Sequence, residues 1–143
     1  MKKEVVISIT GKQSYMDQDP EVIQLVTDGI LEQTASGWDL TYEESDLTGL
    51  EGVTTAFRVE PDVITLDRTG KLTSQMVFQE GKYHDSLYQM SFGALMITVC
   101  ASKVRWDLSE KGGTLDLVYA IEIEKNAAGI IEYHLDIQPK EAV

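Results

Sequence analysis

Cysteine and proline are scarce in this chain, which has one cysteine, Cys100, and three prolines among its 143 residues. A single cysteine excludes an internal disulfide, and a chain without disulfides fits the reducing interior of a cell. We therefore expect a cytoplasmic protein that is stabilised by an apolar core. The length fits a single domain, residues 1–143, which is large enough to bury such a core.

Long apolar runs and clusters of basic residues are also missing. No apolar run approaches the roughly 20 residues that a membrane-spanning helix needs. Lys and Arg number 12 against 24 Asp and Glu, so the formal net charge is -12. Because nucleic acids and anionic membranes both attract cationic surfaces, this acidic chain is expected to bind neither. The charge favours solubility and leaves the oligomeric state open.

What the sequence does contain is alternation of apolar and polar residues in short runs that end at glycine or proline. In one such run, Trp38, Leu40 and Tyr42 alternate with polar neighbours. A period of two is typical of a strand with one buried face. The turn residues between the runs predict about nine or ten strands with short connections. We predict an all-β fold, a single antiparallel meander closed into a barrel, because closure removes exposed strand edges.

Residues 21–33 are ambiguous. Apolar residues recur at helical spacing between Val22 and Ile30, and an Asp-Pro pair precedes them, as at the start of a helix. The β-branched residues of this segment and Gly29 in its middle favour a strand instead. We predict one long strand with a bulge at Gly29, and a helix is the alternative.

Turn signals divide the later part of the chain. Glu80-Gly81-Lys82 predicts a tight turn that pairs the preceding strand with residues 83–90 as a hairpin. Residues 93–99 and 104–108 alternate separately and predict two further strands. A loop is expected at residues 48–52, where glycines interrupt the pattern.

Several short motifs follow one another over nearly the whole chain. They are Tyr42-Glu43-Glu44-Ser45, Thr48-Gly49 continuing to Val53-Thr54-Thr55, Asp67-Arg68-Thr69-Gly70, Phe78 with Gly81, His84 and Tyr88 before Phe92-Gly93, and Asp107-Leu108-Ser109 ahead of Gly112-Gly113. In this order they resemble the YwiB-like family of small bacterial proteins from Firmicutes. The resemblance implies a calycin-type, lipocalin-like β-barrel, and it implies no particular chemistry.

Polar residues that alternation places on apolar strand faces are the candidate functional groups. Glu44 falls on the same face as Tyr42, and Arg68 falls on the same face as Leu66, so both charged side chains are predicted to point into the barrel. A buried charge is costly unless it is paired, which suggests that these two pair with each other. The planar fork of Arg68 suits an anion or a carboxylate.

Other polar side chains complete the predicted lining. Thr55 shares the face of Phe57, and His84 and Tyr88 share one face of their strand. The candidate ligand-binding residues are Arg68, Glu44, Tyr42, Thr55, His84 and Tyr88. In the alternative interpretation, Arg68 extends past the adjacent turn into solvent, and Glu44 and His84 lie on the surface.

Three functions remain open from the sequence. The first is binding of a small, anionic ligand in the barrel lumen, and the second is a filled barrel that presents its surface to a protein partner. The third is an enzyme in which Glu44 or His84 acts as general acid or base. No catalytic set and no cofactor is predicted. Two histidines without cysteine or carboxylate ligands at suitable spacing predict no metal site either.

Overall fold

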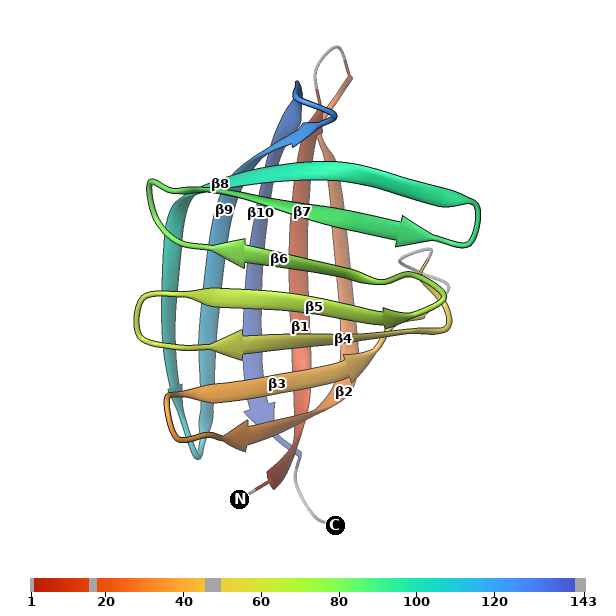
Figure 1. Ribbon diagram of the computed structural model, residues 1–143. Coiled ribbons are helices and arrows are strands. Elements are labelled where there is room, and N and C mark those ends of the chain that lie inside the picture. Colours follow the sequence, from red (N-terminus) through yellow and green to blue (C-terminus); the bar gives the residue numbers. More distant parts are fainter. Residues whose placement is uncertain (1, 16–17, 46–49, 141–143) are drawn as a thin grey trace.

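The computed structural model describes residues 2–15, 18–45 and 50–140. Within these ranges, ten strands form one antiparallel sheet that curls into a barrel (Figure 1). Their order in the sheet is β6-β5-β4-β3-β2-β1-β10-β9-β8-β7, so every neighbouring pair except β1 and β10 is consecutive in the chain. The predicted all-β meander barrel is confirmed. Nowhere in the described ranges is there a helix with the length and apolar character that a membrane span requires.

The strands differ widely in length; in Figure 1, β1, β9 and β10 run upright at the back, and the first part of β8, the longest strand, crosses the front near the top. Their bounds are β1 (Lys2–Tyr15), β2 (Glu21–Gln33), β3 (Trp38–Glu43), β4 (Val53–Val59), β5 (Ile64–Gly70), β6 (Ser74–Phe78), β7 (Tyr83–Met90), β8 (Gly93–Ser109), β9 (Gly112–Ile123) and β10 (Asn126–Pro139). Of the loop expected at residues 48–52, residues 48 and 49 lie outside the described residues, and residues 51 and 52 form a turn.

Strand β2 confirms the predicted strand at residues 21–33, but the predicted bulge at Gly29 is wrong. Gly29 pairs with Val5 in an uninterrupted register between β1 and β2. A Cβ atom at Gly29 would lie 2.5 Å from Cδ1 of Ile7 and 2.8 Å from the carbonyl oxygen of Thr41. The glycine is therefore required by close packing between neighbouring strands and not by a local change of backbone direction.

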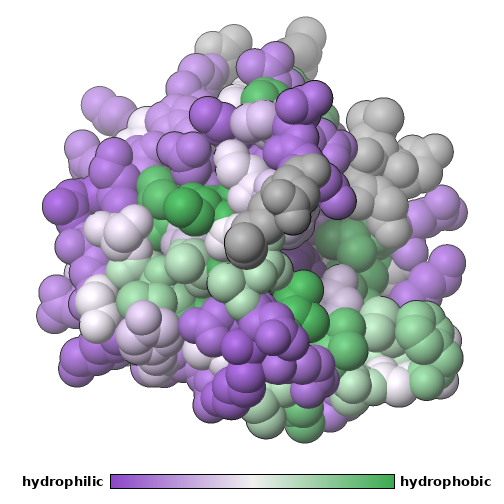
Figure 2. All heavy atoms as spheres, turned by 90° about the horizontal axis from the view of Figure 1, so that it is seen from above, coloured by the Kyte–Doolittle hydropathy of each residue, from purple (hydrophilic) through white to green (hydrophobic). Residues whose placement is uncertain are grey.

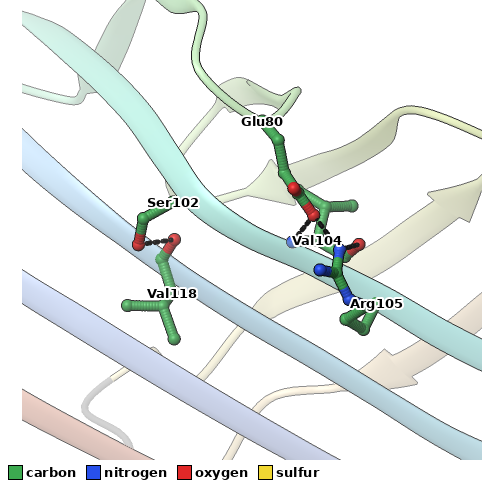
Figure 3. A network of polar contacts seen from close by, with 5 residues as sticks. All are labelled: Glu80, Ser102, Val104, Arg105 and Val118. Atoms are coloured by element: carbon green, nitrogen blue, oxygen red, sulfur yellow. Dashed lines mark hydrogen bonds and ion pairs between the residues drawn. The ribbon is translucent and has the colours of Figure 1, made fainter.

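Strand β8 joins the two strands predicted at residues 93–99 and 104–108 into one. Its register with β9 shifts between Ala101 and Lys103. The extra residue there, Ser102, donates a hydrogen bond of 3.4 Å from Oγ to the carbonyl oxygen of Val118 (Figure 3). Because such a bulge changes which residues face inward, the interior positions are odd-numbered before it and even-numbered after it, as at Leu108.

The barrel closes between β6 and β7 without a continuous ladder, so the predicted hairpin around residues 80–82 is wrong. In the described residues, the two strands are joined at one end by a bridge between Thr73 and Gln89. At the other end, the turn packs on β8, where the amide of Gly81 donates to the carbonyl oxygen of Ala101 at 2.9 Å.

The carboxylate of Glu80 fixes this turn in place (Figure 3). It accepts a hydrogen bond of 2.9 Å from the amide of Val104 and forms an ion pair with Arg105. The hydrogen bond from Val104, followed by the charge of Arg105, lowers the pKa of Glu80. Backbone and side-chain contacts to β8 thus replace the pairing that the sequence predicted between β6 and β7.

The core fills one end of the barrel interior. Large apolar side chains from all sides of the wall meet there and are almost completely buried: Val5, Ile7, Leu40, Phe57, Val59, Ile64, Leu66, Phe78, Val99, Leu115, Leu117, Leu135 and Ile137. Beyond this core, inward residues of β1 and β10 such as Tyr15 and Tyr133 are only partly buried. The candidate site is therefore at the less tightly packed end of the barrel.

Candidate ligand-binding cavity

A cavity of about 350 Å³ occupies the upper end of the barrel, a volume within the usual range for small-molecule sites. Figure 2 looks onto this end, where hydrophobic side chains gather around the middle of the face and hydrophilic ones lie along its left and upper margins. Much of the cavity wall is apolar, with side chains from β1, β2, β6, β8, β9, β10 and the loop before β4: Ile9, Ile23, Leu25, Leu50, Met76, Leu95, Ile97, Ile121, Ile123 and Ile131.

A row of polar residues crosses this wall over four neighbouring strands. Tyr42 of β3 lies opposite Thr55 of β4, Thr55 lies opposite Arg68 of β5, and Arg68 lies opposite Ser74 of β6. The next row toward the filled end is apolar and consists of Leu40, Phe57, Leu66 and Met76. Because directly opposed residues on one face are close neighbours, this row collects polar groups at the boundary between core and cavity.

Arg68 is the cationic group of the cavity. Its side chain lines the cavity, and its Nε atom is buried without a hydrogen-bond partner. Burial acts to lower the pKa of Arg68, but the neighbouring Tyr133, Tyr119 and Glu44 outweigh burial and raise it above its usual value. The guanidinium is therefore charged and lies inside the barrel, which disagrees with the alternative interpretation that it extends into solvent.

Glu44, just beyond the end of β3, is the anionic group of the cavity. Its Oε2 atom accepts a hydrogen bond of 2.5 Å from Oγ1 of Thr55. Tyr42 also forms a hydrogen bond with this carboxylate. Burial, followed by the charge of Glu44, raises the pKa of Tyr42, so the phenol remains protonated and donates to Glu44. Residues on two neighbouring strands thus fix the carboxylate in position.

Tyrosines supply most of the other polar atoms, since five of the six tyrosines in the chain line the cavity. The ring of Tyr119 packs on Phe78 with centroids 4.5 Å apart and lies 6.4 Å from the ring of Tyr133. Burial and then Tyr133 raise the pKa of Tyr119 well above its usual value, and the same two causes raise the pKa of Tyr15. The phenols of Tyr119 and Tyr15 are therefore neutral hydrogen-bonding groups throughout the physiological range of pH.

Four of the six predicted site residues line the cavity: Arg68, Glu44, Tyr42 and Tyr88. Thr55 is completely buried and acts on the cavity through Glu44. His84 is absent from the lining, and its Nε2 atom lies 3.3 Å from Oε1 of Gln79. The structure therefore does not bring His84 and Glu44 to a common cavity.

Sequence reasoning missed Gln13, Tyr15, Tyr119 and Tyr133, which also line the cavity. The period of two contains a signal for each of them. Gln13 and Tyr15 share the face of Ile9 on β1. Tyr119 shares the face of the buried Leu117 on β9, and Tyr133 shares the face of the buried Leu135 on β10. The missing information was where the apolar packing ends, because a tyrosine on an apolar face resembles an ordinary core residue.

The charged side chains of the described lining are Arg68 and Glu44 alone. Over the ranges that the structure describes, no three His, Cys, Asp or Glu side chains gather in a way that would hold a metal ion. What the arrangement offers chemically is an apolar volume with one guanidinium, one fixed carboxylate and several hydroxyl groups.

Fold and cavity together define a ten-stranded antiparallel β-barrel with an internal cavity at one end. The chain belongs to the family described as a domain of unknown function, DUF1934, whose model matches residues 7–137.

Two related findings come from Bacillus subtilis. The chain is 28% identical over 125 residues to the uncharacterized β-barrel protein YwiB of strain 168, a match that covers 86% of each chain. The crystal structure of the ywiB protein superposes with a TM-score of 0.87 over 98% of this chain and 94% of that one, at 20% identity. At this identity the structural likeness establishes the fold alone. The predicted resemblance to the YwiB-like family is confirmed.

Proposed function

We propose that this protein binds a small anionic molecule inside the barrel and that Arg68 holds the anionic end. The observation that carries the proposal is the buried Nε atom of Arg68, which has no hydrogen-bond partner and belongs to a side chain lining a cavity of about 350 Å³. A buried donor without an acceptor is unfavourable, and a charged one more so, unless a bound group supplies the acceptor.

The character of the wall supports binding rather than catalysis. Small-molecule sites are usually apolar concavities with a few polar groups that fix the orientation of the ligand, and this cavity fits that description. The mode of binding we propose is lipocalin-like, with one small molecule in the interior of the barrel. The proposal includes a cytoplasmic location, supported by the single cysteine, and a small molecule rather than a nucleic acid or a membrane as partner, supported by the net charge of -12.

The two alternatives have weaker support. If the protein were an interaction module with a filled barrel, its interior would be packed throughout, whereas the upper end of this barrel contains a cavity. An enzyme that uses Glu44 and His84 as general acid and base needs both within hydrogen-bonding reach of one substrate. Of this pair, Glu44 alone lines the cavity.

Native mass spectrometry of the purified protein tests the proposal. We expect the wild-type protein to retain a small molecule, and the variant Arg68→Leu to lose it. Arg58→Leu is the matched control, because Arg58 lies on the outside of β4 with 54% of its side chain exposed and the charge change is the same. If Arg68→Leu carries the same bound molecules as the wild type and the control, the proposal is wrong.

A further inference from the structure

The chemistry of the ligand's polar end follows from the groups around Arg68. The Nε–H of its guanidinium is buried without an acceptor. Tyr119 and Tyr133 lie close enough to interact electrostatically with Arg68, and their hydroxyl groups are donors as well as acceptors. A guanidinium presents parallel N–H bonds in a plane, which match the two oxygens of a carboxylate. The unpaired Nε–H of Arg68 therefore calls for a hydrogen-bond acceptor, and the planar guanidinium fits a carboxylate.

The charge of this polar end is limited by Glu44. Arg68 and Glu44 are the charged side chains of the described lining, and Glu44 is held in place by Thr55 and Tyr42. Since the charges of Arg68 and Glu44 cancel, a ligand with one negative charge gives the cavity a net charge of -1, and a ligand with two gives it -2. A second negative charge would be buried beside a carboxylate and would have no cation left to neutralise it, which is costly away from water. A monoanion is therefore favoured over a dianion.

The rest of the ligand must suit an apolar wall of limited size. Ten of the lining side chains are aliphatic or methionine, and eight of these ten lie on β1, β2 and β8 to β10. The volume of about 350 Å³ corresponds to about twelve groups the size of a water molecule, which each fill about 30 Å³. The body of the ligand is therefore apolar and short.

We infer that the cavity selects a monocarboxylate with an apolar body, about a dozen non-hydrogen atoms in all. This inference rests on the proposed function and narrows it to one class of ligand. Arg68 binds the carboxylate, and the aliphatic residues of β8, β9 and β10 contact the apolar body.

Isothermal titration calorimetry with three probes of equal chain length tests the inference: decanoate, decanol and decyl phosphate, each below the concentration at which it forms micelles. Decanoate carries one negative charge, decanol carries none, and decyl phosphate is largely a dianion at neutral pH. We expect decanoate to bind at least about tenfold more tightly than either of the others, since a hydrogen bond to a charged group contributes that much or more.

Variants of Arg68 test whether the preference for decanoate depends on the guanidinium. Arg68→Leu should weaken binding of decanoate by at least about tenfold and leave binding of decanol within about threefold, because only the carboxylate uses the guanidinium. Arg68→Lys keeps the charge but loses the planar fork, so it should bind decanoate less tightly than the wild type and more tightly than Arg68→Leu. The outer-face variant Arg58→Leu should match the wild type for all three probes.

The possible results separate this inference from the proposed function. Equal affinity for decanoate and decanol, or tighter binding of decyl phosphate, overturns the monocarboxylate class while leaving a barrel that binds small molecules. If no probe binds but mass spectrometry shows a bound molecule that depends on Arg68, the ligand class is again wrong and the proposed function stands. If no probe binds and no such molecule is found, both are wrong.

Discussion

Replacing Thr55 by valine should destabilise the protein much more than the same replacement of its neighbour Thr54. Both threonines lie on β4 and both donate a hydrogen bond to a glutamate at the end of β3. Thr55 is completely buried and donates to Glu44 at 2.5 Å, whereas Thr54 donates to Glu43 at 2.9 Å on the outer face. Valine preserves the shape of the side chain and removes only the hydroxyl donor.

The expected loss at Thr55 follows from burial. A hydrogen bond to a charged group contributes about 1.5–3 kcal/mol, and the lower half of this range applies because Glu44 keeps its bond to Tyr42. A loss of about 1.5–2 kcal/mol corresponds to a fall of about 3–8 °C in Tm for a domain near this size. Thr54→Val should cost only a few tenths of a kcal/mol, about as much as other exposed polar contacts.

Thermal and urea unfolding followed by circular dichroism measures both variants against the wild type. The difference between them isolates burial, since the strand, the substitution and the type of acceptor are the same. Equal losses, or no loss at Thr55, would mean that Glu44 is not held inside the barrel, and the reasoning about the charge of the cavity would fail with it.

Three further outcomes are expected. Ser74→Ala should leave the free energy of unfolding unchanged or raise it by up to about 1 kcal/mol, because the buried Ser74 hydroxyl has no hydrogen-bond partner; a clear loss in urea unfolding would contradict this. Burial raises the pKa of Tyr119 and Tyr42 in the folded protein. The stability that these neutral phenols contribute is therefore complete below about pH 10, the pKa of tyrosine in the unfolded chain. Above that pH, the free energy of unfolding falls by about 1.4 kcal/mol per pH unit for each tyrosine. Alkaline unfolding should therefore be less steep in Tyr119→Phe, and an unchanged slope would refute the assignment. Glu80→Gln should reduce the protection of the amides of Gly81 and Val104 against hydrogen exchange, with little change elsewhere. In the wild type, the protection of these amides relative to their intrinsic exchange rate at each pH should fall as the pH falls through the lowered pKa of Glu80. Equal protection in both proteins would show that the turn does not depend on this carboxylate.

Much of the barrel and part of its cavity could be predicted from the sequence because a period of two is a strong local signal. Alternation alone placed Tyr42 and Arg68 on inward faces, and the structure finds both in the cavity lining. Each of these positions depends only on neighbours within the same strand. The short connections likewise favoured consecutive strands as neighbours, which holds for every adjacent pair except β1 and β10.

Features that depend on distant parts of the chain were not predictable in the same way. Gly29 is required by the backbone of Thr41 and the side chain of Ile7, and the turn at residues 80–82 is held by Val104 and Arg105 of β8. Alternation also says nothing about how far up the barrel the core extends, so Tyr119 resembled an ordinary buried residue.

Because the core fills only part of the barrel, the residues that stabilise the fold differ from the residues that shape the cavity. On β1, β9 and β10, a densely packed portion anchors the strand, and the portion that shapes the cavity extends beyond that anchor. Substitutions among the cavity residues can therefore change which ligands bind, while the packed core keeps the barrel folded. This makes the molecule a suitable scaffold for building receptors with new preferences.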